Sequence, residues 1–234
     1  MKKHDPRNTP VIVIGAGGTG RYIAQCVDRT KKFCCAGFLD DDIEKQSQLY
    51  NGLTVLGGTD TWRELEDDHL FINSLYGERD MQRYRSIIRR LSIPDDRWAT
   101  IVAPDATIFS AVKIGRGSFV GPGTVVEPGA VIGSQCALLG NVYIAHDCVL
   151  NDYVCCANSV SISGDVFVGE SAFVGANASI RQHLKIGADA IIGMGSVVVK
   201  SVGRGVTVAG NPAKPMKQPN TETKTAPRKP GKTP

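Results

Sequence analysis

The chain has 234 residues, of which 42% are hydrophobic and 21% are charged. This balance is typical of a folded globular protein and excludes a wholly disordered, collagen-like or membrane-embedded chain. No apolar run approaches the ~20 residues that span a bilayer, and the basic N-terminal segment precedes only a short apolar stretch. We therefore expect no membrane insertion, no signal peptide and a cytoplasmic location.

The formal net charge of +4 comes from the C-terminal tail. From Lys214 onward the tail holds six Lys or Arg residues and one acidic residue, a net charge of +5, so the rest of the chain carries about −1. A Pro-, Thr- and Lys-rich tail cannot bury a core, and the remaining chain offers no basic footprint for nucleic acid. The seven cysteines form no Cys-x-x-Cys pair, so we expect reduced, mostly buried thiols.

The first hundred residues alternate between strand-like and helix-like segments. Strands are predicted at Val11–Ile14, Leu53–Leu56 and His69–Leu75, and a further strand is predicted to end at Phe38–Leu39. Helices are predicted at Arg21–Lys31 and Asp80–Leu91. Thr61–Asp67 is predicted as a short helical turn in which Thr61 and Glu64 form a capping box. This alternation predicts a small, mostly parallel sheet.

From about Ala99 onward, the hydrophobic pattern has a period of six residues. Seventeen positions from Val102 to Val198 repeat at this spacing; 16 of them are aliphatic, and the exception is Cys156. The fourth residue after each position is uncharged, and Gly often follows the aliphatic residue directly. Such an internal repeat predicts one architecture for the whole segment.

A period of six suits a prism of short strands joined by tight corners. Each hexad supplies one strand and one turn, three hexads close one triangular coil, and 17 hexads make between five and six coils. The aliphatic side chain points inward, the small residue four places later fits the corner, and Gly permits backbone angles that other residues resist. Strands of successive coils then pair ~4.8 Å apart.

This repeat resembles the left-handed parallel β-helix of hexapeptide-repeat acyltransferases. The left hand is implied by the resemblance alone, because parallel crossovers are generally right-handed. Four segments also occur in the order typical of the sugar acetyltransferases of bacterial surface-glycan and sialic-acid pathways: Gly15–Arg21, Phe38–Asp42, Ile144–Cys148 and Val208–Lys214. The resemblance implies an α/β, Rossmann-like half domain followed by an all-β left-handed parallel β-helix. Thr19 and Cys155 depart from the family pattern, which often has His at both positions.

Gly15, Gly17 and Gly20 fit the G-x-G-x-x-G pattern between a strand and a helix, and Asp40 stands twenty residues beyond. Glycines let backbone N–H groups approach a pyrophosphate, and the N-terminus of a helix favours the anion. A length of about 100 residues holds only one mononucleotide-binding half, which argues against a dehydrogenase. Two interpretations remain: a site for a nucleotide-linked or otherwise anionic sugar, which we favour, and a turn that only packs helix on strand.

The resemblance also implies which residues bind the acceptor. Gly17, Gly18 and Thr19 would line the site, and Gly77 would allow close approach. Asp40 and Asp41 would accept hydrogen bonds from a base or ribose. Thr19 in place of His keeps a hydrogen-bond donor but loses a cation, which leaves the identity of the acceptor open.

His146 is the third residue of its hexad, so its side chain should project out of the prism, and Asp147 follows it. Acyl transfer from a thioester to an amine or hydroxyl needs a base that removes the acceptor's proton, and a His with a pKa near neutrality suits this task. An adjacent carboxylate can fix the tautomer and stabilise the imidazolium. In the Ile-x-His-Asp context of the family we predict His146 as general base and Asp147 as its partner; an ordinary surface histidine is the alternative.

A metal site is an alternative for the coils, because some β-helices of this type hold zinc through three histidines. His146 and His183 stand 37 residues apart, one residue off two coils, and the repeat has no third histidine. We therefore expect no metal.

Acetyl-coenzyme A is the donor and co-substrate that the resemblance implies. Family placement puts it along the coils that follow His146, near Gly164, Gly175, Ala176, Gly193 and Met194. Cys155 replaces a residue that contacts the acetyl group in relatives, so it is either a weak donor to the thioester carbonyl or small filler beside Cys156, which we favour. Arg181, Lys185 and Lys200 are candidates for the cofactor phosphates.

The chain thus divides into a Rossmann-like nucleotide-sugar-binding domain (1–98), a β-helical acetyltransferase domain (99–217) and a disordered basic tail (218–234). By resemblance, the protein is a homotrimer that holds its cofactor between neighbouring prisms. The leading hypothesis is acetyl transfer from acetyl-coenzyme A to the amino group of a nucleotide-linked amino sugar in bacterial surface-glycan biosynthesis. The alternative within this chemistry is O-acetylation of sialic acid or a related sugar, and the competing classes are an oxidoreductase and a non-catalytic scaffold.

Overall fold

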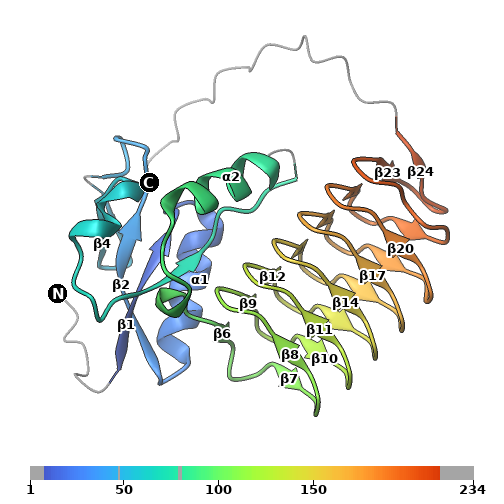
Figure 1. Cartoon of the computed structure of the whole chain (residues 1–234), viewed down its shortest axis with the longest axis horizontal. Coiled ribbons are helices and arrows are strands. Elements are labelled where there is room, and N and C mark those ends of the chain that lie inside the picture. The colour runs from blue at the N-terminus through green and yellow to red at the C-terminus, as the bar shows by residue number, and fades with distance from the viewer. Residues whose placement is uncertain (1–7, 47, 79–80, 217–234) are drawn as a thin grey trace, which may run out of the picture.

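The computed structural model describes residues 8–46, 48–78 and 81–216, which form an α/β unit followed by a long stack of three-sided coils (Figure 1). The predicted basic tail, residues 218–234, lies outside the described residues. Within the described residues, no helix combines the length and the apolar character that crossing a bilayer requires.

The α/β unit is built on a five-stranded sheet of order β3-β4-β2-β1-β5. Its strands are β1 (Thr9–Ile14), β2 (Phe33–Leu39), β3 (Leu49–Tyr50), β4 (Leu53–Gly57) and β5 (Leu70–Asn73). All neighbours pair in parallel except β3 and β4, which confirms the prediction of a mostly parallel sheet. The two-residue strand β3 is absent from the sequence prediction.

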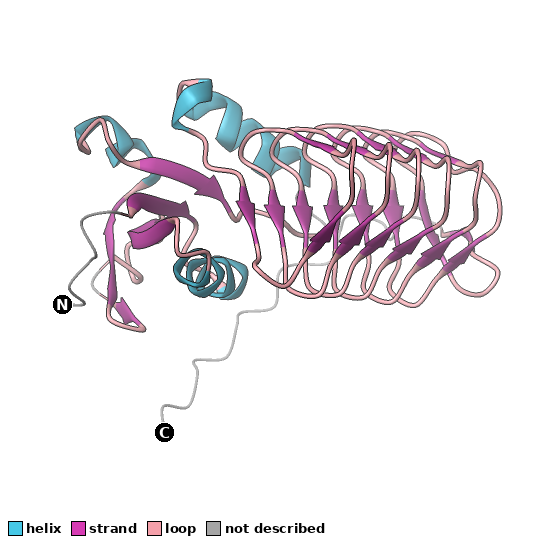
Figure 2. Ribbon diagram, turned by 90° about the horizontal axis from the view of Figure 1, so that it is seen from below, coloured by secondary structure: helices cyan, strands magenta, loops and turns pink. Residues whose placement is uncertain are grey.

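Two helices cover the two faces of this sheet (Figure 2). On one face, Val11 and Val13 of β1 pack with buried residues of α1 (Gly18–Arg29). On the other face, Ile12 and Ile14 pack with buried residues of α2 (Met81–Leu91). Because β1 is buried on both faces, its sequence is a continuous apolar run without polar alternation.

The predicted capping box at Thr61 and Glu64 is wrong. The 3₁₀ helix η1 (Thr59–Glu64) begins two residues earlier, with Gly58 as its N-cap and no side-chain cap. The carboxylate of Asp41 instead accepts a hydrogen bond from the N–H of Thr59, at 2.6 Å. A second 3₁₀ helix, η2 (Asp95–Arg97), leads into the coils.

The coils have three flat faces, each a parallel sheet. Face one contains β6 (Ile101–Val102), β9 (Phe119–Val120), β12 (Ala137–Leu138), β15 (Cys155–Cys156), β18 (Phe173–Val174), β21 (Ile191–Ile192), β23 (Thr207–Ala209) and the antiparallel β24 (Lys214–Pro215). Face two contains β7 (Thr107–Ile108), β10 (Val125–Val126), β13 (Tyr143–Ile144), β16 (Ser161–Ile162), β19 (Ser179–Ile180) and β22 (Val197–Val198). Face three contains β8 (Lys113–Ile114), β11 (Val131–Ile132), β14 (Val149–Leu150), β17 (Phe167–Val168) and β20 (Lys185–Ile186).

The hexad prediction is confirmed strand by strand. Each of the 17 strands from β6 to β22 ends on one of the predicted inward positions. Strands pair 18 residues apart, as Val125 does with Tyr143, so three hexads close one coil. The inward side chains form one continuous hydrophobic core along the axis.

The glycines that directly follow the inward residues serve a different purpose from the one predicted. The left-handed backbone falls on the third residue after the inward position, where non-Gly residues such as Asp147 (φ +58°) adopt it repeatedly. The glycines directly after the inward residues are needed for close packing: a Cβ at Gly115 would lie 2.5 Å from the backbone of the next coil. The steric requirement thus lies between coils rather than within the turn.

The α/β unit packs against face one. Tyr22 of α1 meets the ring of Phe119 edge to face, with centroids 5.8 Å apart. On α2, Arg85 reaches Glu170 at 3.2 Å and Asp189 at 3.4 Å. Both helices therefore fix the unit on the prism.

Candidate active site

The glycines of the turn after β1 are of two kinds: some are required by close packing, and others leave their backbone open to a ligand. Gly15 has a φ of +102°, and a Cβ at Gly20 would lie 1.9 Å from the carbonyl oxygen of Gly15. At Gly17 and Gly18, in contrast, a Cβ would meet nothing within 4 Å. Gly15 and Gly20 are thus required by the fold, and Gly17 and Gly18 present open backbone.

That open backbone is the N-terminus of α1. Gly17 is its N-cap, no side chain caps the helix, and no acidic residue lies in its first turn. The first N–H groups of a helix have no partner within the helix, and the helix dipole favours an anion beside them. The turn is therefore suited to a phosphate group.

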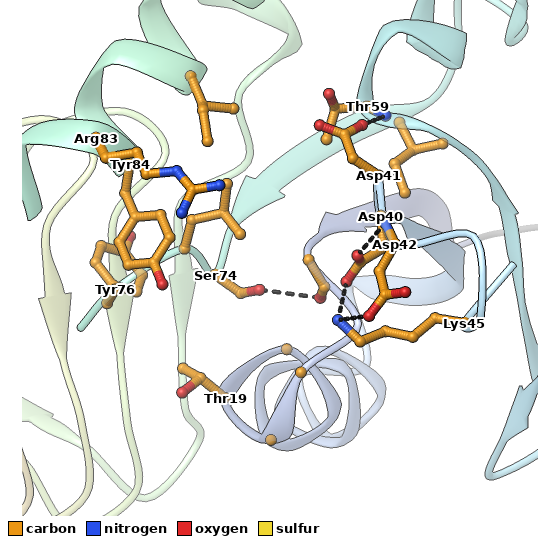
Figure 3. A pocket seen from close by; sticks show the side chains of 17 residues that line it. Thr19, Asp40, Asp41, Asp42, Lys45, Thr59, Ser74, Tyr76, Arg83 and Tyr84 are labelled. Atoms are coloured by element: carbon orange, nitrogen blue, oxygen red, sulfur yellow. Dashed lines mark hydrogen bonds and ion pairs between the residues drawn. The ribbon is translucent and has the colours of Figure 1, made fainter. Parts of the chain in front are cut away.

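A cleft of about 610 Å³ opens above this turn (Figure 3). The glycine turn and the ends of β1 and β2 form one wall, and α2 contributes Arg83 and Tyr84 opposite. The lining residues that carry its polar chemistry are Gly17, Gly18, Thr19, Asp40, Asp41, Asp42, Lys45, Thr59, Ser74, Tyr76, Arg83 and Tyr84.

Asp40 fastens the cleft wall. Its carboxylate accepts hydrogen bonds from the N–H of Ala16 at 2.8 Å and of Asp42 at 3.0 Å, and from Lys45 Nζ at 3.0 Å. Burial would by itself raise the pKa of this carboxyl, but these donors outweigh it and lower the pKa. With about four acceptor positions on a carboxylate, Asp40 keeps little capacity for a ligand. Asp41 is more exposed and binds Thr59 through one oxygen.

Of the predicted acceptor residues, the structure brings Gly17, Gly18, Thr19, Asp40 and Asp41 together in the cleft. Gly77 is not among the lining residues; a Cβ there would approach the ring of Tyr84 to 3.2 Å. Its small size therefore makes room for the Tyr84 ring on the α2 wall, and its predicted role at the acceptor site stays a prediction.

Sequence reasoning missed the two cations of the cleft. Lys45 follows Asp40 by five residues and is paired with Asp40 and Asp42. Arg83 stands on the exposed side of α2, which carries four arginines that the sequence alone does not distinguish. Only the placement of α2 beside the glycine turn distinguishes Arg83 from the others.

The cleft continues toward the prism. A second hollow of about 590 Å³ shares Gly18 and Thr19 with it and reaches Asn141 and Asn158 on the coils. These two residues belong to the first corner, which we define as the turns after face one (residues 139–142, 157–160, 175–178 and 193–196). Burial raises the pKa of Tyr22, which lines this hollow, to about 12.

His146 lies on the second corner, the turns after face two (residues 127–130, 145–148, 163–166 and 181–184). Its side chain is 60% exposed, which confirms the predicted outward projection. Nδ1 lies 2.9 Å from Oδ2 of Asp147, and this hydrogen bond raises the pKa of the imidazole. The bond places the proton of the neutral ring on Nδ1, so Nε2 is the basic nitrogen.

Two glycines make room for this pair. A Cβ at Gly164, one coil above, would lie 2.6 Å from Nε2 and Cε1 of His146. A Cβ at Gly129, one coil below, would lie 2.4 Å from Oδ1 of Asp147. Gly164 was predicted near the cofactor, and its direct contact in the chain is the imidazole itself.

The other predicted cofactor residues occupy a different corner. Gly175, Ala176, Gly193 and Met194 lie on the first corner, where Met194 is 76% exposed. His146 and Gly164 lie on the second corner. A single chain therefore does not bring the predicted cofactor residues together, and it also separates His146 from the cleft.

Cys155 is buried between the two units. Its side chain is 1% exposed and packs in a cluster with Met81 and Ala137. Burial raises the pKa of its thiol to about 12. This position favours filling over contact with a cofactor, and the burial disfavours a thiolate.

Among residues 8–46, 48–78 and 81–216, the one group of three metal-ligating side chains whose donor atoms lie within 4.8 Å is Glu66, Asp68 and His69. It lies on the α/β unit, and neither coil histidine belongs to it. His183 instead binds Asp165, with Nδ1 and Oδ2 2.9 Å apart. All seven cysteines are buried and free of disulfides.

Comparison with known proteins matches both units. Residues 10–74 match the PglD N-terminal domain, and residues 165–200 match the bacterial transferase hexapeptide (six repeats). The GDP-perosamine N-acetyltransferase of Escherichia coli O157:H7 is 31% identical over 219 residues, covering 89% of this chain and 97% of that protein. The chain spans 43% of the length of an acyl-[acyl-carrier-protein]–UDP-N-acetylglucosamine O-acyltransferase from Aliivibrio fischeri, to which it is 36% identical over 117 residues.

Two solved structures extend the likeness to the whole fold. The acetyltransferase domain of PglB from Neisseria gonorrhoeae, in complex with acetyl coenzyme A, superposes with a TM-score of 0.78 at 28% identity, covering 89% of this chain and 100% of that one. PerB from Caulobacter crescentus, in complex with CoA and GDP-perosamine, superposes with a TM-score of 0.77 at 25% identity, covering 89% of this chain and 97% of that one. The predicted fold class, an α/β unit followed by a left-handed parallel β-helix, is confirmed.

Proposed function

The chain belongs to the hexapeptide-repeat sugar N-acetyltransferases with a PglD-type N-terminal domain, and from this premise we propose that it transfers the acetyl group of acetyl-coenzyme A to the amino group of a nucleotide-linked sugar. The observation that carries this proposal is the exposed imidazole of His146, which Asp147 holds through Nδ1 while Nε2 stays basic. GDP-perosamine, named for the relatives, is the first acceptor to test.

In this mechanism His146 is the general base. Nε2 takes a proton from the sugar nitrogen as the C–N bond to the acetyl carbon forms, and Asp147 stabilises the imidazolium. The C–S bond then breaks, and the imidazolium returns the proton to the departing sulfur. The products are an N-acetyl sugar and free coenzyme A, and no acetyl-enzyme intermediate is needed.

The cleft would hold the nucleotide part of the acceptor. The N-terminus of α1 at Gly17 and Gly18, together with Lys45 and Arg83, supplies positive potential for a diphosphate. Thr19 stands between the cleft and the second hollow, which leads to the first corner. The sugar would extend from the diphosphate into that hollow, toward an acetyl donor.

A homotrimer would complete the site. Because His146 lies on the second corner and the cleft opens toward the first, a neighbouring copy must bring the imidazole to the acceptor. Aromatic side chains are exposed beside the second corner, at Tyr143 and Phe167, where a neighbouring prism would cover them. In this arrangement Gly164 of one copy and Gly175, Ala176, Gly193 and Met194 of the next border one cofactor channel.

We further propose the domain boundaries, the cellular location and the biosynthetic role that the sequence predicts. Residues 1–98 form the acceptor-binding domain, 99–217 the transferase domain, and 218–234 a basic tail outside both. The enzyme works in the cytoplasm in bacterial surface-glycan biosynthesis, where both acetyl-coenzyme A and nucleotide sugars occur.

Thiol release from acetyl-coenzyme A tests the reaction. The acceptors are GDP-perosamine, UDP- and dTDP-linked amino sugars, and free sialic acids. His146→Ala should lower kcat ~10²-fold or more, while His183→Ala, which removes an equally exposed imidazole–carboxylate pair, keeps the wild-type rate. Alkali-labile acetylation of sialic acid alone would establish O-acetylation instead, and full activity of His146→Ala would overturn the mechanism.

Mixing two inactive variants tests the shared site. His146→Ala lacks the base, and a Lys45→Ala/Arg83→Ala double variant lacks the cations of the cleft. If the site combines two copies, co-refolded mixtures regain activity, because some sites pair an intact cleft with an intact imidazole. A mixture as inactive as its components would show that each chain holds a whole site.

A further inference from the structure

One carboxylate near His146 has no role in the proposed mechanism. Oε2 of Glu127, one coil below, accepts a hydrogen bond from the backbone N–H of His146 at 2.9 Å. Its other oxygen, Oε1, accepts a hydrogen bond from the hydroxyl of Tyr143, on the same coil as His146. Glu127 thus ties the peptide that carries the imidazole to a neighbouring strand.

The same backbone position is held differently elsewhere in the prism. The N–H of Ser134 donates to Oδ1 of Asp152 at 2.8 Å, and the N–H of Gly140 donates to Oδ1 of Asn158 at 3.0 Å. In both cases the acceptor comes from the residue 18 positions later, on the coil above.

At the second corner this acceptor is missing for a steric reason. The residue 18 positions after His146 is Gly164, which has no side chain, and any Cβ there would collide with the imidazole. The room that the imidazole needs therefore leaves no side chain at position 164 to accept from its own peptide N–H, as Asp152 and Asn158 do at the other two corners. Glu127 supplies the acceptor from the coil below instead.

We propose that Glu127, oriented by Tyr143, is a positioning residue for His146 that fixes the peptide under the imidazole and adds a negative charge beside the imidazolium. This inference rests on the proposed function, since it names a support of the same base. Glu127 touches neither reacting atom in the mechanism and acts through His146.

The surrounding charges all act in one direction. The carboxylates that face the imidazole are Asp147 on its own turn, Glu127 on the coil below and Asp165 on the coil above, and the last is itself paired with His183. The bond to Asp147 raises the pKa of His146 most, and Glu127 adds to this increase. The hydrogen bonds from Tyr143 and from the His146 N–H lower the pKa of Glu127, which keeps it ionised.

The test measures the imidazole directly. An NMR titration of His146 in the full-length protein, without substrates, follows its pKa in wild type, Glu127→Gln, Glu127→Ala and Tyr143→Phe. Glu127→Gln keeps an acceptor oxygen but loses the charge, so the pKa of His146 should fall. Asp165→Asn is the matched control, because it removes a nearby charge whose carboxylate does not bind the His146 peptide, and it keeps the Asp165 N–H that donates to the His146 carbonyl at 3.0 Å.

Steady-state kinetics separate position from charge. Displacing a base by ~1 Å can cost ~10²-fold in rate, so Glu127→Ala should lower kcat by at least ~10-fold with KM for both substrates unchanged. Glu127→Gln and Tyr143→Phe should lose less, whereas Asp165→Asn should change the pH profile but not the maximal kcat.

An unchanged pKa of His146 in Glu127→Gln, with wild-type kcat in Glu127→Ala, would overturn the positioning role. If wild type transfers acetyl to no acceptor, the proposed function fails, and the titration still decides whether Glu127 acts on His146.

Discussion

The two units of this protein encode their contacts in different ways. On the coils, a residue's neighbours follow from its number, because strands pair every 18 residues and each corner repeats the same turn. In the α/β unit, the contacts that shape the cleft join residues at irregular separations: Asp40 binds Ala16 across 24 positions, and Ser74 binds the Ile14 carbonyl across 60. The neighbours of a functional residue on the coils can therefore be predicted from its position in the repeat, whereas those of a residue in the cleft cannot.

Deviations from the repeat are also informative on the coils. At two corners, the backbone N–H of Ser134 and that of Gly140 donate to an Asp or Asn side chain from the coil above. At the equivalent position above His146 stands Gly164, where a Cβ would lie 2.6 Å from the imidazole. The glycine above His146 thus marks the space that the imidazole occupies.

The largest expected effect breaks the repeat itself. Ile180 faces the core and is 1% exposed, whereas its neighbour Ser179 on the same strand is exposed. Ile180→Asp buries an unpaired carboxylate and should cost about 4 kcal/mol or more, enough to prevent folding of a marginally stable chain. Ser179→Asp should change the free energy of unfolding by less than about 1 kcal/mol.

Circular dichroism and thermal unfolding compare the two variants. A folded Ile180→Asp protein with a wild-type melting temperature would contradict the assignment of inward and outward positions.

The next effect concerns activity rather than stability. Gly164→Ala places a Cβ 2.6 Å from Nε2 and Cε1 of His146, which is closer than van der Waals contact allows. The ring is the end of a flexible, exposed side chain, so it can rotate away at little cost to folding, but its bond to Asp147 is then lost. We expect kcat to fall ~10²-fold through misplacement of the base.

Gly205→Ala is the control for this glycine substitution. Gly205 has a φ of +67° and open space around it, so alanine costs only the ~1–2 kcal/mol of a left-handed backbone. Equal losses of kcat in both variants would show that Gly164 has no specific relation to the imidazole.

The sequence predicts the coils better than the cleft for a physical reason. All 17 strands follow from one period, because the narrow prism admits only small or aliphatic side chains inward. The glycine turn and Asp40 also follow from a local pattern. In contrast, η1 starts at Thr59, whose N–H donates to Asp41 in the loop after β2, a contact that no local capping box reveals.

The residues that sequence analysis missed all act across space. Lys45 and Arg83 belong to the cleft through the fold of the loop after β2 and the position of α2. Glu127 stands 19 residues before His146, and only the stacking of coils brings its carboxylate to the His146 peptide. Charged residues on a soluble surface are common, so composition alone cannot select these three.

A smaller effect tests the joint between the two units. Arg85 of α2 is 16% exposed and binds Glu170 at 3.2 Å, Ser171 Oγ at 3.0 Å and the 5% exposed Asp189 at 3.4 Å. Arg85→Ala leaves the buried carboxylate of Asp189 with one partner fewer and should cost about 2 kcal/mol. Because α2 also carries Arg83 and Tyr84, KM for the sugar nucleotide should rise more than kcat falls.

Arg29→Ala is the control for removal of an arginine. Its pair with Asp105, at 3.4 Å, is about half-exposed on both sides, so its loss should cost less than about 1 kcal/mol. Calorimetry and steady-state kinetics on both variants decide the comparison; equal melting temperatures would show that α2 is not held by its ion pairs.

The smallest effect concerns Cys155, which faces the α/β unit from the outer side of face one. Its thiol is 1% exposed, and its neighbour Cys156 points into the prism at 0%. If both are filler, Cys155→Ala and Cys156→Ala should each cost about 1 kcal/mol in the free energy of unfolding and leave KM for acetyl-coenzyme A unchanged. A ~10-fold rise in that KM for Cys155→Ala alone, without loss of stability, would instead make its thiol a donor to the thioester carbonyl. Comparing these two variants thus decides whether the two units only pack together at face one or also bind acetyl-coenzyme A there. The burial of both side chains favours packing.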